Sequence, residues 1–317
     1  MRIIAAYNEL RCQLAARLAR SRWSKGLAAA RTIAPSTTSL VGNRRRSAAP
    51  LPMPACSHLI YHQETVDRTA AENSIETLVA QLPIEDEVLI LDVGGAGGPD
   101  LLKPFQAFEW ATYSSCRAKR PEQRSYTFGL NAAIAGLKAS RIFVWRTDYV
   151  YPPGLYHAYC KAMESAWFAA PYDVLVGRPE VDSTFVRAAK NRLNPFDETY
   201  WGERSTRLSL YETQDPALFA ITRQLWNRIG GLNHELWGYG WQFAEFAVRV
   251  RRACPRRRIA YFNAAPPLHQ THEGSQMHNP AERKAEAEAG RLRFVQFLGG
   301  EAAYEMYRLK QRLAPNK

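Results

Sequence analysis

Long apolar runs are absent from this 317-residue sequence. A membrane-spanning helix needs about 20 consecutive apolar residues, so no transmembrane helix is expected. Cysteine is also scarce, and the five cysteines form neither a CxxC pair nor the spacing of a zinc site. We interpret them as free thiols in a reducing compartment, which favours a cytoplasmic protein. They are Cys12, Cys56, Cys116, Cys160 and Cys254.

Acidic residues are almost absent from residues 1–55, which contain ten Lys or Arg and a single acid, Glu9. Because the whole chain has a net charge of +12, residues 56–317 contribute only +3. The basic character therefore belongs mainly to the N-terminal segment, and no nucleic-acid partner is expected for the rest of the chain.

Three interpretations of residues 1–55 stay open. Their Arg-, Ala- and Ser-rich composition is typical of a transit peptide. A short amphipathic helix around residues 10–18 would instead give peripheral contact with a membrane surface or an acidic partner. The third interpretation is an extension without function, disordered near residues 35–54. A secretory signal is not expected, because the segment lacks an apolar core.

From residue 58 onward, short apolar segments alternate with helical patterns. Strands are expected at 58–61, 88–91, 108–113, 142–145, 174–176, 218–221 and 259–262. Helices are expected at 69–82, 126–139, 155–166, 224–229 and 241–252, and Thr69 with Glu72 predicts a capping box at the start of the first one. This alternation, with short connections, predicts an α/β fold in which a mainly parallel central sheet is flanked by helices.

The same pattern predicts the domain organisation. Residues 56–280 form the α/β domain, and residues 281–317 form a C-terminal helical cover. Asn279 and Pro280 are a favourable start for its first helix, as N-cap and first-turn residue. A long polar surface loop is expected at residues 187–211.

Two carboxylates follow buried strands, at the end where open parallel sheets bind ligands. Asp92 precedes a glycine-rich stretch that begins at Gly94, which would let the backbone approach a nucleotide closely. The alternative is a plain glycine-rich turn, and the dinucleotide-binding fingerprint fails because Pro99 interrupts it. Asp148 suits a divalent cation that neutralises a diphosphate. Its alternative is a turn or helix-cap aspartate before Pro152.

Glycines and aromatic residues gather between residues 230 and 241. Trp237 and Trp241 offer flat apolar faces for stacking on a sugar ring or a base. Downstream, Glu245 could accept a proton from an acceptor hydroxyl, whereas the alternative is an i,i+4 surface ion pair with Arg249. His269, in the loop after the last expected strand, is either a metal ligand or a polar surface residue.

In their order along the chain, these segments resemble the GT-A fold glycosyltransferases. The likeness is to the family-2-like enzymes, and in the C-terminal part to the galactosyltransferase and polypeptide N-acetylgalactosaminyltransferase group. It spans roughly residues 57–278. Residues 90–94 resemble the strand that ends in the nucleotide-contacting Asp, residues 129–133 the ALNxG helix, and residues 143–148 the DxD strand. Residues 230–233 and 236–240 resemble the GGFN…FWGWGxED motif on the acceptor side.

The resemblance implies a nucleotide-diphospho-sugar transferase fold and a UDP-sugar or other nucleotide sugar as donor. It implies a divalent cation, Mn²⁺ or Mg²⁺, held by Asp148 and His269, and Glu245 as the nearest candidate base. The donor contacts that it implies are Asp92, Gly94, Asn131, Arg146, Asp148, Trp237, Gly240 and Trp241.

The sequence departs from the family pattern at two places. Arg146 stands where DxD has its first Asp, so Arg146 would offset diphosphate charge directly and weaken the need for a metal. Gln242 and Phe243 stand where the acceptor-side motif has Glu and Asp, and that Asp is typically the base of inverting enzymes. Glu245 then serves as the base, or the chemistry is altered, or the domain binds without catalysing.

The sequence therefore predicts an inverting glycosyltransferase that acts on a glycan or lipid-linked acceptor, as in polysaccharide biosynthesis. The first alternative is a catalytically silent relative that binds nucleotide sugars. The second is a basic adaptor that acts through residues 1–55 on a nucleic acid or a membrane.

Overall fold

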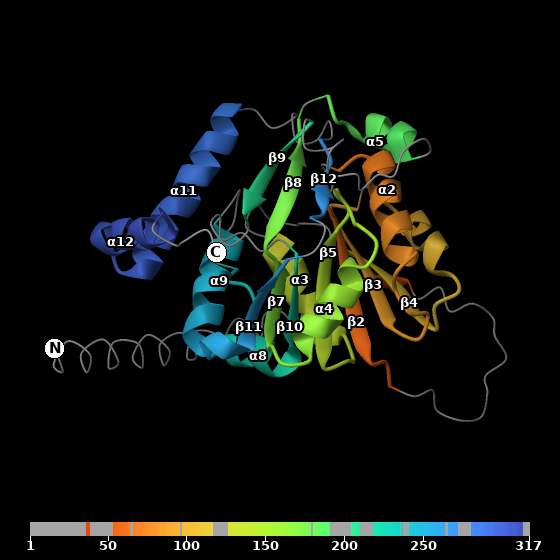
Figure 1. The fold of residues 1–317 in the computed structure, drawn as a ribbon, viewed down its shortest axis with the longest axis horizontal. Helices are drawn as coiled ribbons and strands as arrows, with labels where there is room; N and C mark the ends of the chain where they lie inside the picture. The colour runs from red at the N-terminus through yellow and green to blue at the C-terminus, as the bar shows by residue number, and fades with distance from the viewer. Residues whose placement is uncertain are drawn as a thin grey trace. The chain divides into compact units, whose positions relative to one another are not determined.

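The computed structural model describes residues 36–38, 53–63, 66–95, 97–116, 126–178, 180–190, 204–209, 218–234, 236, 241–263, 266–271 and 280–312 (Figure 1). Predictions for Trp237, Gly240, residues 272–279 and most of residues 1–55 concern residues outside this set. The four cysteines within the set are free thiols. Each helix within it is too short or too polar to cross a membrane.

The main sheet has eight strands among the described residues. In sheet order they are β1 (Ser36–Thr38), β4 (Trp110–Cys116), β3 (Glu87–Val93), β2 (Cys56–Gln63), β5 (Arg141–Arg146), β10 (Phe219–Thr222), β7 (Phe168–Pro171) and β11 (Ile259–Phe262). Strands β4, β3, β2 and β5 are parallel neighbours. Strand β10 runs antiparallel between β5 and β7, and β11 is parallel to β7. The predicted α/β class with a mainly parallel central sheet is confirmed.

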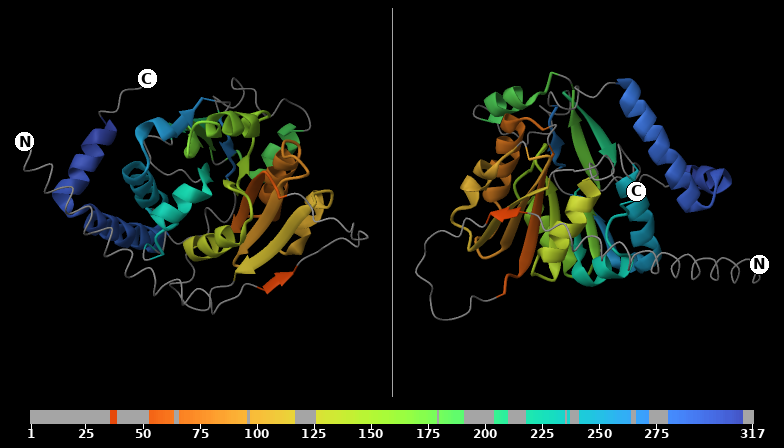
Figure 2. Two further views of the ribbon diagram at one scale, coloured as in Figure 1. Left: turned by 90° about the horizontal axis from the view of Figure 1, so that it is seen from below. Right: turned by 180° about the vertical axis from the view of Figure 1, so that it is seen from behind.

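Helices cover both faces of this sheet (Figure 2). They are α2 (Arg68–Val79), α3 (Tyr126–Gly136), α4 (Leu155–Met163), α5 (Ser183–Lys190), α8 (Arg223–Ile229), α9 (Gln242–Ala253), α11 (Pro280–Leu298) and α12 (Glu301–Arg312), with the 3₁₀ segments η1 (Pro99–Phe105) and η3 (Arg256–Arg258). Successive strand side chains point to opposite faces. Ile60 therefore packs in the core with α2 and α4, whereas Leu59 packs with α3, α8 and α9. Because both faces are covered, the strands read as continuous apolar runs.

A smaller second sheet extends the carboxyl end of β5. Its order is β6 (Tyr149–Val150), β12 (Leu268–His269), β8 (Asp173–Gly177) and β9 (Ser205–Ser209). Strand β12 is antiparallel to β6 and parallel to β8, so His269 lies opposite Tyr149. Two segments about 120 residues apart in sequence are thereby joined directly after the main sheet ends.

Some local predictions are wrong. Helix α2 is capped by Asp67, whose carboxylate accepts a hydrogen bond from the Ala70 N–H at 2.8 Å, and not by Thr69. The predicted loop at residues 187–211 contains the end of α5 and strand β9. Strand β7 was not predicted, because four residues are too few to show a period. Strand β5 ends at Arg146, so Asp148 lies in the turn that follows it.

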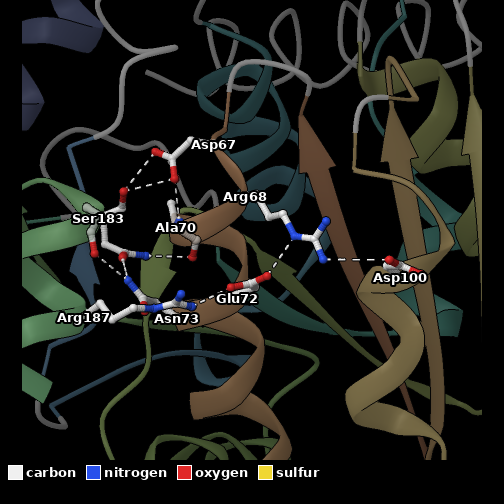
Figure 3. A network of polar contacts seen from close by, with 9 residues as sticks. Asp67, Arg68, Ala70, Glu72, Asn73, Asp100, Ser183 and Arg187 are labelled. Carbon is white, nitrogen blue, oxygen red and sulfur yellow. Dashed lines mark hydrogen bonds and ion pairs between the residues drawn. The ribbon is translucent and has the colours of Figure 1, made fainter. Parts of the chain in front are cut away.

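A buried polar network ties α2 to α5 (Figure 3) and to Gln270, the residue after β12. Asn73 of α2 is fully buried and donates through Nδ2 to the Ser183 carbonyl at 2.9 Å and to Gln270 Oε1 at 2.8 Å. Gln270, also fully buried, donates through Nε2 to the Ala70 carbonyl at 3.1 Å. Its backbone N–H donates to the Asp148 carbonyl at 2.9 Å. The network therefore fixes the turn that carries Asp148.

Replacing Asn73 by alanine tests this network. Asn73→Ala leaves the Ser183 carbonyl and Gln270 Oε1 without their buried donor, and we expect the free energy of unfolding to fall by about 1–3 kcal/mol. The control is Arg68→Ala on the same helix, whose side chain is 71% exposed and pairs with Glu72. It should cost at most about 1 kcal/mol. Equal losses for both variants, measured by urea unfolding, would contradict a structural role for the network.

Candidate functional site

The carboxyl ends of β3, β2 and β5 lie side by side at one edge of the main sheet. The register places Asp92 of β3 opposite His62 of β2. Arg146, the last residue of β5, lies opposite Tyr61, the neighbour of His62 in β2. Adjacent strands are about 4.8 Å apart, so Asp92 and Arg146 are two strand spacings from each other. Open α/β sheets bind ligands beyond this edge.

Asp148 is the centre of a charged cluster at this edge. Its side chain is 1% exposed and accepts hydrogen bonds from Arg146 through both carboxylate oxygens, from Nε at 2.9 Å and from Nη2. His269 Nε2 lies 3.2 Å from Asp148 Oδ2. The pairing of β6 with β12 brings His269 to this position. The structure therefore joins the two residues that the resemblance implies as metal ligands.

Arg146 is held firmly from several sides. The Tyr151 hydroxyl accepts the Arg146 N–H at 2.8 Å and donates to the Arg146 carbonyl at 2.6 Å. The guanidinium carbon lies 5.8 Å from the ring centre of Tyr61 and 5.6 Å from that of Tyr149, within cation–π range. Burial would lower the pKa of Arg146, but the charge of the Asp148 carboxylate raises it well above its ordinary value. Arg146 is therefore a permanent cation with a fixed position.

These residues do not fit a resident divalent cation. Such an ion takes six or more oxygen ligands, usually including more than one carboxylate or substrate phosphates. Both oxygens of Asp148 are already engaged by Arg146. Within the described ranges, no group of three or more His, Cys, Asp or Glu side chains could hold a metal ion. The place of a cation beside Asp148 is taken by the guanidinium.

Asp92 is fully buried and organises the loop that follows β3. Its carboxylate accepts hydrogen bonds from the Gly95 N–H at 3.1 Å, the Gly98 N–H at 2.9 Å and the Tyr113 hydroxyl at 2.6 Å. Gly98 has a φ of +70°, a conformation that L side chains rarely adopt. These contacts thus agree with the interpretation that Asp92 stabilises a glycine-rich turn. Contact between Asp92 and a nucleotide stays a prediction.

This glycine loop packs against the neighbouring strand end. A Cβ atom at Gly97 would lie 2.6 Å from His62 Cδ2, so only glycine allows this close approach. His62 Nδ1 lies 2.9 Å from the Thr147 hydroxyl, next to Asp148. Gly94 donates its N–H to the Cys116 carbonyl at 3.0 Å. The loop after β3 and the turn after β5 therefore contact each other through His62.

A second polar cluster lies between α3 and α9. Asn131 donates through Nδ2 to the Leu232 carbonyl at 2.7 Å and accepts the Leu232 N–H at 2.8 Å. Arg249 donates to the Gly231 carbonyl at 2.6 Å. Arg249 also donates to Glu245, from Nε to Oε1 at 2.6 Å and from Nη2 to Oε2 at 2.7 Å. The i,i+4 pair predicted as the alternative role of Glu245 is therefore present, but Glu245 is 1% exposed, so the pair is buried and not on the surface as predicted.

Trp241 packs toward the C-terminal helices. Its ring stacks on Phe294 of α11, with centroids 5.3 Å apart and planes at 25°, and meets Tyr304 of α12 at 5.9 Å. Trp241 has a φ of 67°, the one positive value among the described residues other than glycine. A left-handed conformation costs an L residue about 1–2 kcal/mol, which the aromatic contacts offset. Stacking of Trp241 on a sugar or base stays a prediction.

The predicted site residues thus fall into two groups. Asp92, Gly94, Arg146, Asp148 and His269 belong to the strand-end cluster, and Asn131, Glu245 and Trp241 belong to the region around α3 and α9. The sequence analysis missed four residues of the strand-end cluster. Their only sequence signal is that each adjoins a strand end. These residues are Tyr61, His62, Tyr149 and Tyr151.

No protein-family model matches this chain, and a search of curated proteins finds no match. Solved structures do match it. S. aureus TarS 1–349 in complex with UDP-GlcNAc is 12% identical with a TM-score of 0.47, and the match covers 82% of this chain and 72% of that one. Mannosyltransferase PcManGT from Pyrobaculum calidifontis, in complex with GDP-Man and Mn²⁺, is 14% identical with a TM-score of 0.44, covering 86% and 84%.

Glucosyl-3-phosphoglycerate synthase from Mycobacterium tuberculosis, in complex with Mn²⁺, UDP and glucosyl-3-phosphoglycerate, is another match. It is 12% identical with a TM-score of 0.45, and the match covers 74% of this chain and 79% of that one. Against the longer S. aureus TarS structure, the match spans only 36% of that chain. At these identities and TM-scores, the proposals below depend on the residues of this chain.

Proposed function

We propose that the chain is a GT-A type glycosyltransferase that moves a sugar from a nucleotide-diphosphate donor to a glycan or lipid-linked acceptor, with inversion. One observation carries the proposal. A glycine-rich loop anchored by Asp92 and a buried cluster of Arg146, Asp148 and His269 lie at the carboxyl edge of neighbouring parallel strands. This edge is where such sheets bind nucleotides.

The chemistry of the edge suits the two halves of such a donor. The loop after β3 presents backbone groups held in place by Asp92, which suits a nucleoside. Two strand spacings away, the Arg146 guanidinium suits a diphosphate, because a planar fork of N–H donors matches phosphate oxygens. Gly94 belongs to the same loop. We assign Trp237 and Gly240 to the donor contacts, as the resemblance implies.

The proposed transfer breaks one bond and forms one. The acceptor oxygen attacks the anomeric carbon of the sugar, and the bond from that carbon to the diphosphate breaks, so the diphosphate leaves with the bonding electrons. Glu245 is our proposed acceptor of the hydroxyl proton. Both its oxygens are engaged by Arg249 and it is 1% exposed, so it must exchange that pairing to reach an acceptor. We place the reaction in polysaccharide biosynthesis in the cytoplasm.

The Glu245–Arg249 pair also favours the alternative function, a silent protein that binds nucleotide sugars. In that case Glu245 serves only to hold Arg249, which in turn holds the Gly231 carbonyl. The strand-end cluster would then bind a donor that never reacts.

Nucleotide binding tests the proposal directly. We expect isothermal titration of the full chain with UDP and GDP, and with their sugars, to show binding of at least one. Asp92→Ala should weaken that binding tenfold or more, equivalent to about 1.4 kcal/mol, since the loop loses its anchor. Asp100→Ala on η1 is the control, because its side chain is 49% exposed, and its binding should match the wild type. Binding of none of these nucleotides would refute the proposal.

Glu245→Gln separates the enzyme from the silent binder. If Glu245 is the base, the variant should lose about 10²–10⁴-fold in turnover while its nucleotide affinity stays unchanged. The measurement is release of UDP or GDP from the bound sugar donor, with and without saccharide acceptors. Arg249→Lys serves as a comparison, because it perturbs the pair without removing the carboxylate. A wild type that binds donors and never releases the nucleotide favours the silent binder.

A further inference from the structure

Resting on the proposed function, we infer that the donor site works without a metal ion, and that the Arg146 guanidinium contacts the diphosphate in place of a divalent cation. The ion pair at the end of β5 carries this inference. It joins the residue that would bind the metal, Asp148, to a cation that belongs to the chain itself.

The Arg146 guanidinium has N–H groups that do not bond to Asp148. Arg146 uses Nε and Nη2 for Asp148, and its third nitrogen, Nη1, has no hydrogen bond to the described residues. A guanidinium carries five N–H donors, so the two on Nη1 can bind oxygens of an anion. The Arg146 side chain is 20% exposed, whereas that of Asp148 is 1% exposed. The Arg146–Asp148 pair has no net charge, but the Arg146 guanidinium is the member that reaches the surface.

The surroundings keep Arg146 in this orientation. Tyr151 fixes its backbone with two hydrogen bonds, and the rings of Tyr61 and Tyr149 lie within cation–π range of the guanidinium. Asp148 is held in turn by Gln270, whose N–H donates to its carbonyl. Charge develops on the leaving diphosphate in the transition state. A hydrogen-bond donor that is already in position stabilises this charge, because it needs no rearrangement.

A metal ion would have to break this arrangement. To coordinate Asp148 it must displace Arg146 from a buried carboxylate, and removing one partner of a buried ion pair is strongly unfavourable. Among the described residues of the cluster, His269 is the other side chain that could coordinate the ion, and no group of three metal-ligating side chains exists in the described part of the chain. The preformed ion pair therefore excludes a resident cation from Asp148.

The first experiment uses the wild-type chain. UDP and GDP are titrated by calorimetry in excess EDTA and again with Mn²⁺, and Mn²⁺ binding is followed by electron paramagnetic resonance. We expect the nucleotide affinity to be the same in both buffers and Mn²⁺ to stay unbound by the protein alone. Affinity that requires Mn²⁺ would overturn the inference and leave the proposed function standing. Absence of binding in both buffers would overturn the proposed function and the inference with it.

Variants of Arg146 test whether this residue contacts the diphosphate. Arg146→Lys should weaken nucleotide binding in EDTA about tenfold or more, because a point charge lacks the planar fork. Arg146→Asp should abolish binding in EDTA and recover it with Mn²⁺, since it provides a second carboxylate two residues from Asp148. Arg141→Lys, at the opposite end of β5, is the control and should bind as the wild type does. Unchanged binding by Arg146→Lys in EDTA would contradict the inference, with circular dichroism confirming that each variant folds.

Discussion

The buried ion pair between Arg146 and Asp148 is the constraint on which the rest of the strand-end cluster depends. A carboxylate that is 1% exposed is stable only with a partner that offsets its charge and fills its hydrogen-bonding sites. Arg146 does both through Nε and Nη2. Because Arg146 is the last residue of β5, the parallel sheet sets the position of the pair. The pair in turn sets the electrostatic environment of a ligand bound at this edge.

Two long-range connections keep this pair in place. The β6–β12 pairing brings His269 to Asp148, and the hydrogen bonds of Gln270 tie the Asp148 turn to α2. Neither connection involves the main sheet, so the second sheet serves to complete the cluster. Asn73, at the centre of the buried network, links the same turn to α5. The site is therefore built where two sheets meet, and its charged side chains are already paired with one another.

The α/β class followed from the sequence because strands buried on both faces read as continuous apolar runs, as around Ile90, and amphipathic helices have a strong period, as around Ile75. The i,i+4 spacing of Glu245 and Arg249 likewise predicted their ion pair as one alternative, but not that the pair is buried. Strands β6 and β12 have two residues each and carry no period, so the contact of His269 with Asp148 came only from the family resemblance. The bond between Asn73 and Gln270 spans 197 residues, and no local pattern reports such a contact.

Direct binding of a nucleotide diphosphate to the exposed side of the Arg146–Asp148 pair is best tested by a crystal structure of the chain with UDP or GDP, grown in EDTA. We expect a phosphate oxygen within hydrogen-bonding distance of Arg146 Nη1 and an Asp148 carboxylate still paired with Nε and Nη2. A nucleotide bound away from the ends of β2, β3 and β5, or an Asp148 carboxylate released from Arg146 in the complex, would contradict it.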